Sequence, residues 1–573
     1  MEGRIERSDE KWVLLATILA SSMAFIDSSA LNVTLPRIQA DVGITGGGVF
    51  WVVNAYGLTL AALILVGGVL GDRYGRKRVF AFGIALFTAA SIVCGLSTSG
   101  GMLIAARAVQ GVGGALMTPG SLALIAALFP DERRGVAIGT WSTFSTLTTI
   151  LGPVLGGWLA EQGLWRMIFF INVPLAAIAL FVLVTRVPES RERQDGARLD
   201  LAGATLATLG LAGLSYGLLQ LGESGSGDPL VIAALVVGVL ASVAFVILEL
   251  RIAHPMLPPS LFKSRTFSGA NLLTLFLYGA LGGFLVFLPL NVIQAQGYSS
   301  SEAGFVFLPF AIILTLLSRQ AGRMVDRIGA RPMLIVGPAI TGLGFAAMAL
   351  PGLTNGAADY WISYFPGVVL MGIGMGITVA PLTTAVMTSA PRDSAGVASG
   401  VNNAVARTAG VLAVAVFGAL ALGLFASSLN ARTAEFPLSD EARAALSAEA
   451  QNLGGAQPPA DLAEPLRAQI ETAIRWSFVD TFRLAAVLAA VLAFLSAGAA
   501  AVLVEPKKQT LGDPSGPDAP QPQQERERFP EADDSVSGMA TSARQRILFW
   551  TGWSCMQKTK PPALCEEGRR RKV

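Results

Sequence analysis

The sequence predicts an all-α polytopic membrane protein, and three observations indicate it: the composition, a series of long apolar runs, and the placement of positive charge between them. The chain has 573 residues, of which 53% are hydrophobic and only 14% are charged, whereas about 25% are charged in a typical soluble protein. Its mean hydropathy is +0.57. So few charges cannot cover so much apolar surface in water, and most of the chain must therefore lie in lipid. This balance argues against a soluble enzyme, a nucleic-acid-binding protein and a secreted disulfide scaffold.

Fourteen apolar runs are long enough to span the hydrocarbon core, which takes about 20 residues in a helix. The first run is too long for the core of a signal peptide, so we expect a retained spanning helix there. The runs lie near residues 12–35, 49–70, 79–97, 102–128, 136–160, 167–185, 200–221, 230–250, 267–294, 303–318, 332–350, 361–388, 398–426 and 479–504.

The short loops between these runs alternate in charge. Loops on one side are rich in Lys and Arg, whereas the short loops on the other side contain only Arg37 and Arg166. Because Lys and Arg in short loops remain cytoplasmic, both termini are expected in the cytoplasm. We expect a multi-pass protein of the bacterial cytoplasmic (inner) membrane. Residues 427–478 should form a partly helical outer loop, and residues 505–573 are too poor in apolar residues to fold alone and should be disordered.

A short sequence pattern recurs in two of the cytoplasmic loops. Gly68 to Lys77 and Gly322 to Arg331 both follow G-x-x-x-D-R-x-G-x-[KR]. Such repetition indicates a duplication into two six-helix halves related by an axis along the membrane normal. The predicted parts are an N-terminal bundle at 1–185, a linker with an inserted hairpin at 186–265, and a C-terminal bundle at 266–504. A binding site is expected at the midline between the two bundles.

The first loop and five other segments, in this order along the chain, resemble the major facilitator superfamily and, within it, the fourteen-span drug:proton antiporters of the EmrB/QacA type. The five segments are DSSALNVTLP at 27–36, WVVNAY at 51–56, RAVQGVGG at 107–114, GPVLGG at 152–157 and WRMIFFINVP at 165–174. The resemblance covers about residues 12–504. It implies the major facilitator fold and proton-coupled efflux of amphipathic toxic compounds or antibiotics by alternating access. It also implies that the proton gradient supplies the energy, without a cofactor.

Asp27 is the most informative single residue. It lies roughly 22 Å along the first span, and an acid at such depth costs about 2.5–3.5 kcal/mol, so it should face a cavity or a partner. Arg107 in the fourth span and Asn54 in the second span are expected at a similar depth. The resemblance implies that Asp27 couples protons and that Arg107 assists proton transfer. Our hypothesis is that protonation of Asp27 and drug binding are mutually exclusive, with Arg107 tuning the acid. The alternatives are a structural acid and an arginine that reaches the outer interface.

Two further groups of residues are predicted to control movement between the halves. In the repeated loops the glycines permit a tight turn, and Asp72 should latch onto a helix N-terminus or an arginine of the facing half. The alternative is that the basic residues there only fix the topology. The predicted gating-loop residues are Gly68, Gly71, Asp72, Arg73, Gly75, Arg76, Asp326, Arg327 and Gly329.

The fifth span resembles the antiporter motif of the family, with Thr148 in place of one of its glycines. Its small residues let helices approach closely, and its proline permits a kink. Close packing alone is the alternative role. The motif residues are Gly139, Gly152, Pro153, Gly156 and Gly157.

Polar and aromatic side chains within the spans are candidates for a substrate cavity. They are Asn54, Tyr56, Gln110, Trp141, Asn271, Tyr278, Asn402, Asn403 and Arg407. The second half lacks a clear acid within its spans, so we expect a neutral, zwitterionic or singly positive amphipathic cargo; alternatively, Arg407 attracts an anionic group. The expected partners are this cargo, protons and the lipid bilayer, with the chain working as a monomer. No metal site or Walker A sequence is present, and the sequence does not specify a periplasmic adaptor.

Other functions remain open at this point. The same helices would serve an exporter of an endogenous metabolite or lipid, or a proton-coupled importer. A polytopic membrane enzyme is the less favoured alternative, because it should show a cluster of His, Asp or Ser at one membrane interface, and none is visible in the sequence.

Overall fold

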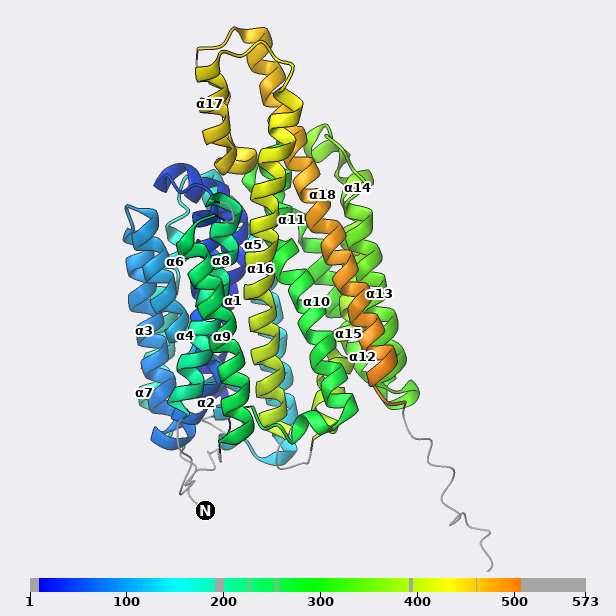
Figure 1. The fold of residues 1–573 in the computed structure, drawn as a ribbon. Coiled ribbons are helices and arrows are strands. Elements are labelled where there is room, and N and C mark those ends of the chain that lie inside the picture. The colour runs from blue at the N-terminus through cyan, green and yellow to red at the C-terminus, as the bar shows by residue number, and fades with distance from the viewer. Residues whose placement is uncertain are drawn as a thin grey trace, which may run out of the picture. The chain divides into compact units, whose positions relative to one another are not determined.

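A computed structural model describes residues 10–190, 200–224, 227–252, 257–390, 395–459 and 461–506, together with Pro255. All the regular elements of this part of the chain are helices (Figure 1). The described helices belong to one compact unit that ends at Lys508. The tail expected to be disordered lies, from residue 507 on, outside the described residues.

The N-terminal bundle and the inserted hairpin are built from nine helices of the described chain. They are α1 (Glu10–Val42), α2 (Gly47–Tyr74), α3 (Arg76–Leu96), α4 (Gly100–Leu128), α5 (Asp131–Glu161), α6 (Met167–Phe170), α7 (Asn172–Arg186), α8 (Leu201–Ser224) and α9 (Pro229–Arg251). The α8–α9 hairpin packs through α8 against α2 and α16, one helix from each half.

The C-terminal bundle has longer helices and more interruptions. Its elements are η1 (Leu261–Lys263), α10 (Arg265–Leu290), the π-helical turn η2 (Asn291–Ala295), α11 (Ser300–Val306), α12 (Leu308–Ile328), α13 (Ala330–Met348), η3 (Gly356–Asp359), α14 (Tyr360–Ser363), α15 (Phe365–Thr388), α16 (Ala395–Thr433), α17 (Asp440–Glu449), η5 (Ala450–Gly455) and α18 (Glu464–Leu503).

The predicted number of spans agrees with these helices. In the described part of the chain, 13 helical segments are long and apolar enough to cross a membrane. The fourteenth predicted span is α5, which has 31 residues and packs along α1. Its Thr- and Ser-rich first half lowers its hydropathy, although its place in the bundle is that of a spanning helix. The chain is therefore an integral, multi-pass membrane protein.

The two repeated loops have the same backbone geometry. Gly75 separates α2 from α3 with φ of 109°, and Gly329 separates α12 from α13 with φ of 82°. In both loops the glycine N–H donates to the carbonyl four residues earlier, at 3.0 Å in the first and 2.9 Å in the second. Left-handed backbone of this kind favours glycine, which explains why the pattern contains glycine at this position.

The long loop between the last two spans is largely helical, as the sequence predicted. The helices α16 and α18 have 39 and 40 residues, which corresponds to about 60 Å each, or twice the hydrocarbon thickness. Both therefore continue well past the predicted spans and carry α17 at one end of the molecule (Figure 1). Their Ala-rich extensions favour helix without needing lipid. We call this the loop end, and the end at which α1 begins the N-terminal end.

Candidate functional site

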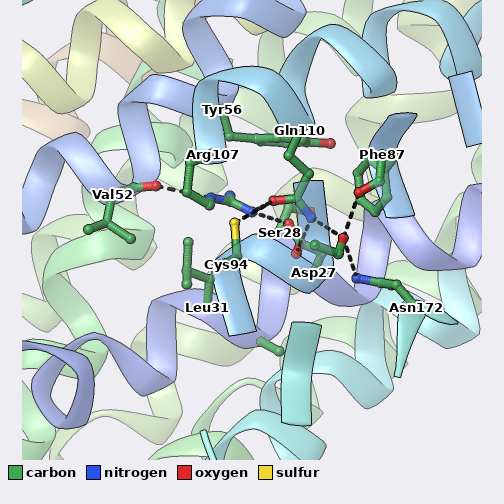
Figure 2. Close-up of polar contacts among 12 residues, drawn as sticks. Asp27, Ser28, Leu31, Val52, Tyr56, Phe87, Cys94, Arg107, Gln110 and Asn172 are labelled. Carbon is green, nitrogen blue, oxygen red and sulfur yellow. Dashed lines mark hydrogen bonds and ion pairs between the residues drawn. The ribbon is translucent and has the colours of Figure 1, made fainter. Parts of the chain in front are cut away.

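The centre of the N-terminal bundle holds a buried ion pair. Asp27 of α1 and Arg107 of α4 are 0% and 1% exposed, and Asp27 Oδ2 accepts a hydrogen bond from Arg107 Nη1. Arg107 Nε also donates to the carbonyl of Val52 at 3.2 Å, and Arg107 Cζ lies 4.5 Å from the centre of the Tyr56 ring. The sequence placed both charged residues at a similar depth, and the structure brings them into direct contact (Figure 2).

Gln110, one turn after Arg107, joins the ion pair to a polar network. Its Nε2 donates to Asp27 Oδ1 at 2.9 Å and to Ser91 Oγ at 2.8 Å, and its Oε1 accepts from Arg107 Nη1 at 2.6 Å. Asn172 Nδ2 donates to the same Ser91 oxygen at 3.2 Å (Figure 2). All carboxylate oxygens of the pair are thus satisfied in the dry interior, which is the condition for keeping a buried charge.

A cavity of about 490 Å³ lies between the two halves, beside this ion pair. Arg107 lines it, whereas Asp27 lies behind Arg107 and does not. Five of the predicted cavity residues line its wall: Asn54, Tyr56, Tyr278, Asn403 and Arg407. They come from α2, α10 and α16, so the cavity is at the midline, as predicted from the repeat.

Four other predicted cavity residues do not line this cavity, because neighbouring side chains already satisfy them. Gln110 belongs to the buried network described above. Trp141 Nε1 donates to Ser21 Oγ at 3.0 Å. Asn402 Nδ2 donates to Asn271 Oδ1 at 3.2 Å and to Thr274 Oγ1 at 2.7 Å. These side chains hold helices together within one half.

The first gating loop is tied to its own half. Arg76 Nε lies 2.8 Å from Asp72 Oδ1, one helical turn away, and no described residue of the facing half forms an ion pair or hydrogen bond with Asp72. Instead, Glu189 Oε1 accepts from the Lys77 N–H at 3.0 Å and caps the start of α3. Gly75 leaves the room for Glu189, since a Cβ there would lie 2.7 Å from its carboxylate. The side chain of Asp326 in the second loop lies outside the described part of the structure.

The antiporter motif of α5 serves close packing at its last three glycines. Gly152 and Gly156 lie against Ser29 and Ala30 of α1, and Pro153 lines the cavity. Gly157 lies against the backbone of Ser300 in the opposite half. Gly139 has no neighbour within 4 Å at the position a Cβ would take, so close packing does not explain this glycine.

The two halves meet at the loop end along α5, α11 and the end of α1. Gly304 of α11 lies against the backbone of Pro153 so closely that it leaves no room for a side chain. Gln294 Nε2 donates to Gln39 Oε1 at 3.1 Å, and Gln39 Nε2 donates to the carbonyl of Asn452 in η5 at 3.1 Å. By contrast, most side chains of α5 between residues 135 and 151 are exposed. Along α5, the two halves are therefore in contact at the loop end, whereas α5 is exposed toward the N-terminal end.

Sequence reasoning missed two of the residues that organise the site. Ser91 accepts from two amides at the centre of the network, but one serine in an apolar run gives no sign of its partners. Glu189 is one of four acidic residues interspersed with four arginines between residues 186 and 200. Nothing in that mixed loop singles out Glu189 as a capping residue.

Two repeated helical bundles around a central cavity, with an ion pair buried beside it, define a membrane transporter of the alternating-access type. The sequence pattern of the Major Facilitator Superfamily matches residues 17–415, and the chain belongs to that superfamily. The crystal structure of a bacterial homologue of the human lysosomal transporter Spinster, in an inward-facing and unoccupied conformation, has the same fold. Its TM-score is 0.58 at 18% identity, over 86% of this chain and 98% of that chain.

Relatives of known name place the chain among the drug-resistance exporters of the superfamily. The multidrug resistance protein Stp of Mycobacterium tuberculosis is 33% identical over 73% of this chain and 77% of its own length. The cephamycin export protein CmcT of Amycolatopsis lactamdurans is 36% identical over 70% of this chain and 83% of its own length. The fourteen-span exporter family indicated by the sequence motifs is thus confirmed.

Proposed function

We propose that this chain exports amphipathic toxic compounds or antibiotics from the bacterial cytoplasm in exchange for protons, by alternating access. The observation that carries the proposal is the buried Asp27–Arg107 pair, whose arginine forms part of the cavity wall. Burying an ionisable side chain within a membrane bundle costs stability, so such a residue is expected to have a function. The resistance and export functions named for the relatives support the same conclusion.

The ion pair can couple proton binding to cargo binding. While Asp27 is ionised, it holds the Arg107 guanidinium together with Gln110 and the Val52 carbonyl. Protonation removes the countercharge and weakens the strongest of these bonds. The freed Arg107 side chain can then move into the cavity and occupy part of the space that the cargo takes. Protonation of Asp27 therefore weakens cargo binding, which is the requirement for exchange.

The contact between the two halves at the loop end fits a state that receives cargo from the cytoplasm. The N-terminal end carries the basic short loops, so we place it on the cytoplasmic side, with both termini. Cargo would enter the cavity from the cytoplasm past the exposed part of α5. It would leave on the opposite side after the two halves rotate relative to each other. One proton entering across about 100 mV gives roughly 2.3 kcal/mol, or about a fifty-fold gradient of a neutral cargo.

The proposal requires no cofactor and no catalytic chemistry, since the proton gradient supplies the energy. It also requires only one chain, because both halves that line the cavity belong to the same polypeptide. We therefore propose a monomeric transporter rather than an enzyme. Its partners are its cargo, protons and lipid.

Transport by purified protein in proteoliposomes tests this function. A neutral fluorescent amphipath should accumulate against its gradient when an acid gradient is imposed. Asp27→Asn should abolish this accumulation and retain equilibrium exchange of the compound, because only proton coupling is lost. Asp228→Asn is the matched control: this acid caps α9 through the Leu230 N–H, away from the cavity. Accumulation by Asp27→Asn, or accumulation that requires nucleotide, would contradict the proposal.

A further inference from the structure

Arg407 puts a positive charge into the cavity wall without a countercharge. It lies on α16, in the C-terminal half, and the cavity lining of the described chain contains neither Asp nor Glu. Among the described residues Arg407 forms no ion pair or hydrogen bond, and it shares the cavity wall with Tyr56 and Tyr278. Arg107 in the opposite wall differs, because Asp27 neutralises it. While Asp27 is ionised, the cavity is therefore positively charged overall.

Besides Arg407, the cavity wall carries an unpartnered amide donor on Asn54, an unpartnered amide acceptor on Asn32 and an apolar surface. Asn54 Nδ2 is buried and has no hydrogen-bond partner, although its residue forms part of the wall. A buried amide donor without a partner favours a ligand that brings an acceptor. The remaining wall is largely apolar, with Leu281, Phe307 and Phe310 among its residues. A ligand that suits this site has an apolar body and one strongly accepting, negatively charged group.

We propose that the cargo of this transporter carries an anionic group, a carboxylate or an acidic enol or phenol, which Arg407 binds. This inference rests on the proposed export function and narrows it to a substrate class. Arginine suits this task because its planar guanidinium donates two parallel hydrogen bonds to a carboxylate. A neutral or zwitterionic amphipath can still enter the cavity, whereas a simple cation is repelled by it.

An anionic cargo also changes the energetics of exchange. If one proton enters for each monoanion that leaves, two charges cross the membrane potential in the favourable direction. A potential of about 100 mV then sustains roughly a 2,500-fold cargo gradient, against about fifty-fold for a neutral cargo. The charge that fixes the cargo in the cavity therefore also allows the potential to drive it out.

Equilibrium binding to the full chain in nanodiscs, with no gradient present, tests the inference. The probes are dansyl-phenylalanine and its carboxamide, which share an apolar body and differ in the anionic group. The unaltered chain should bind the acid at least about tenfold more tightly than the amide. Arg407→Gln should remove this preference by weakening acid binding alone. Arg407→Lys should keep a reduced preference, because it retains the charge without the fork of donors.

Two controls separate this inference from the proposed function. Arg432→Gln removes a positive charge from the same helix outside the cavity, where Asp480 pairs with it, and should leave the preference intact. Asp27→Asn should abolish proton-driven transport and still bind the acid more tightly than the amide. Equal binding of the two probes by the unaltered chain, or an acid preference that persists in Arg407→Gln, would overturn the inference while leaving proton coupling untouched.

Discussion

The two halves share their loop geometry but differ in the chemistry of their interiors. In the N-terminal half, Asp27, Arg107 and Gln110 form a charged network. In the C-terminal half, the amides of Asn271 and Asn402 join with Thr274 in a neutral one. Duplication has thus preserved the backbone, down to the left-handed glycine of each loop, while the side chains have diverged. The comparison teaches that a repeated fold can hold a charged, titratable network in one half and a neutral one in the other.

The difference has a physical consequence for how each half responds to protons. Amides do not titrate, so the hydrogen bonds of the C-terminal network persist whatever the protonation state of the protein. An ion pair in a dry interior depends strongly on charge, because removing one partner leaves the other uncompensated. The N-terminal half should therefore be sensitive to protons and mutations, and the C-terminal half tolerant of both.

The largest expected effect comes from breaking the ion pair from one side. Arg107→Ala leaves the Asp27 carboxylate buried without its countercharge and should destabilise the protein by about 3–5 kcal/mol. Asn402→Ala removes two neutral hydrogen bonds in the other half and should cost about 1–2 kcal/mol. The two purified variants are heated in detergent, and size-exclusion chromatography measures the fraction of each that remains folded at each temperature.

The double variant Asp27→Asn with Arg107→Gln is the control for this comparison. Without either charge the interior is neutral, so much of the lost stability should return while proton coupling stays absent. If Asn402→Ala destabilised the protein as much as Arg107→Ala, the proposed division between the halves would be wrong.

A smaller effect is expected at a place where the halves are alike. Gly156 of α5 lies against Ala30 of α1, and Gly282 of α10 lies against Gly410 of α16. A Cβ on Gly156 would lie 2.6 Å from the Ala30 carbonyl oxygen, and one on Gly282 would lie 2.7 Å from Gly410 Cα. Alanine at either position should therefore cost about 1–3 kcal/mol, since backbone atoms must move. The same unfolding measurement applies.

Gly139→Ala is the matched control within the same motif, because no atom lies within 4 Å of its Cβ position. It should leave the stability unchanged or slightly higher, since alanine favours helix. A loss equal to that of Gly156→Ala would mean that the glycines of α5 act through helix flexibility and not through packing.

The sequence predicted the fold well, because apolar runs and loop charges are properties of the chain itself. All fourteen predicted spans correspond to helices, and the positions of Asp27 and Arg107 along their spans predicted a similar depth for the two residues. Hydropathy located the spans within α16 and α18, and the loop between them was predicted to be partly helical. The length of the helical extensions was not predicted, since residues beyond lipid have no hydropathy signal. Polar residues at the right depth were likewise hard to assign: Asn403 lines the cavity, whereas the adjacent Asn402 points into its own half. Such neighbours differ only in the direction that each side chain takes around the helix axis, and this direction depends on how the helix is rotated in the bundle.

The smallest expected effect concerns how the helix after each repeated loop begins. Glu189 caps α3 in the first loop, whereas no side chain of the described residues caps α13 in the second loop, which follows Gly329. Glu189→Gln keeps the shape and one acceptor but removes the charge next to the helix N-terminus, so stability should fall by only about 0.3–1 kcal/mol. The cost should shrink further in high salt, because the carboxylate is about one-third exposed, at 33%. Unfolding measured at low and high salt would reveal this, and a loss independent of salt would show that Glu189 acts by packing instead of charge.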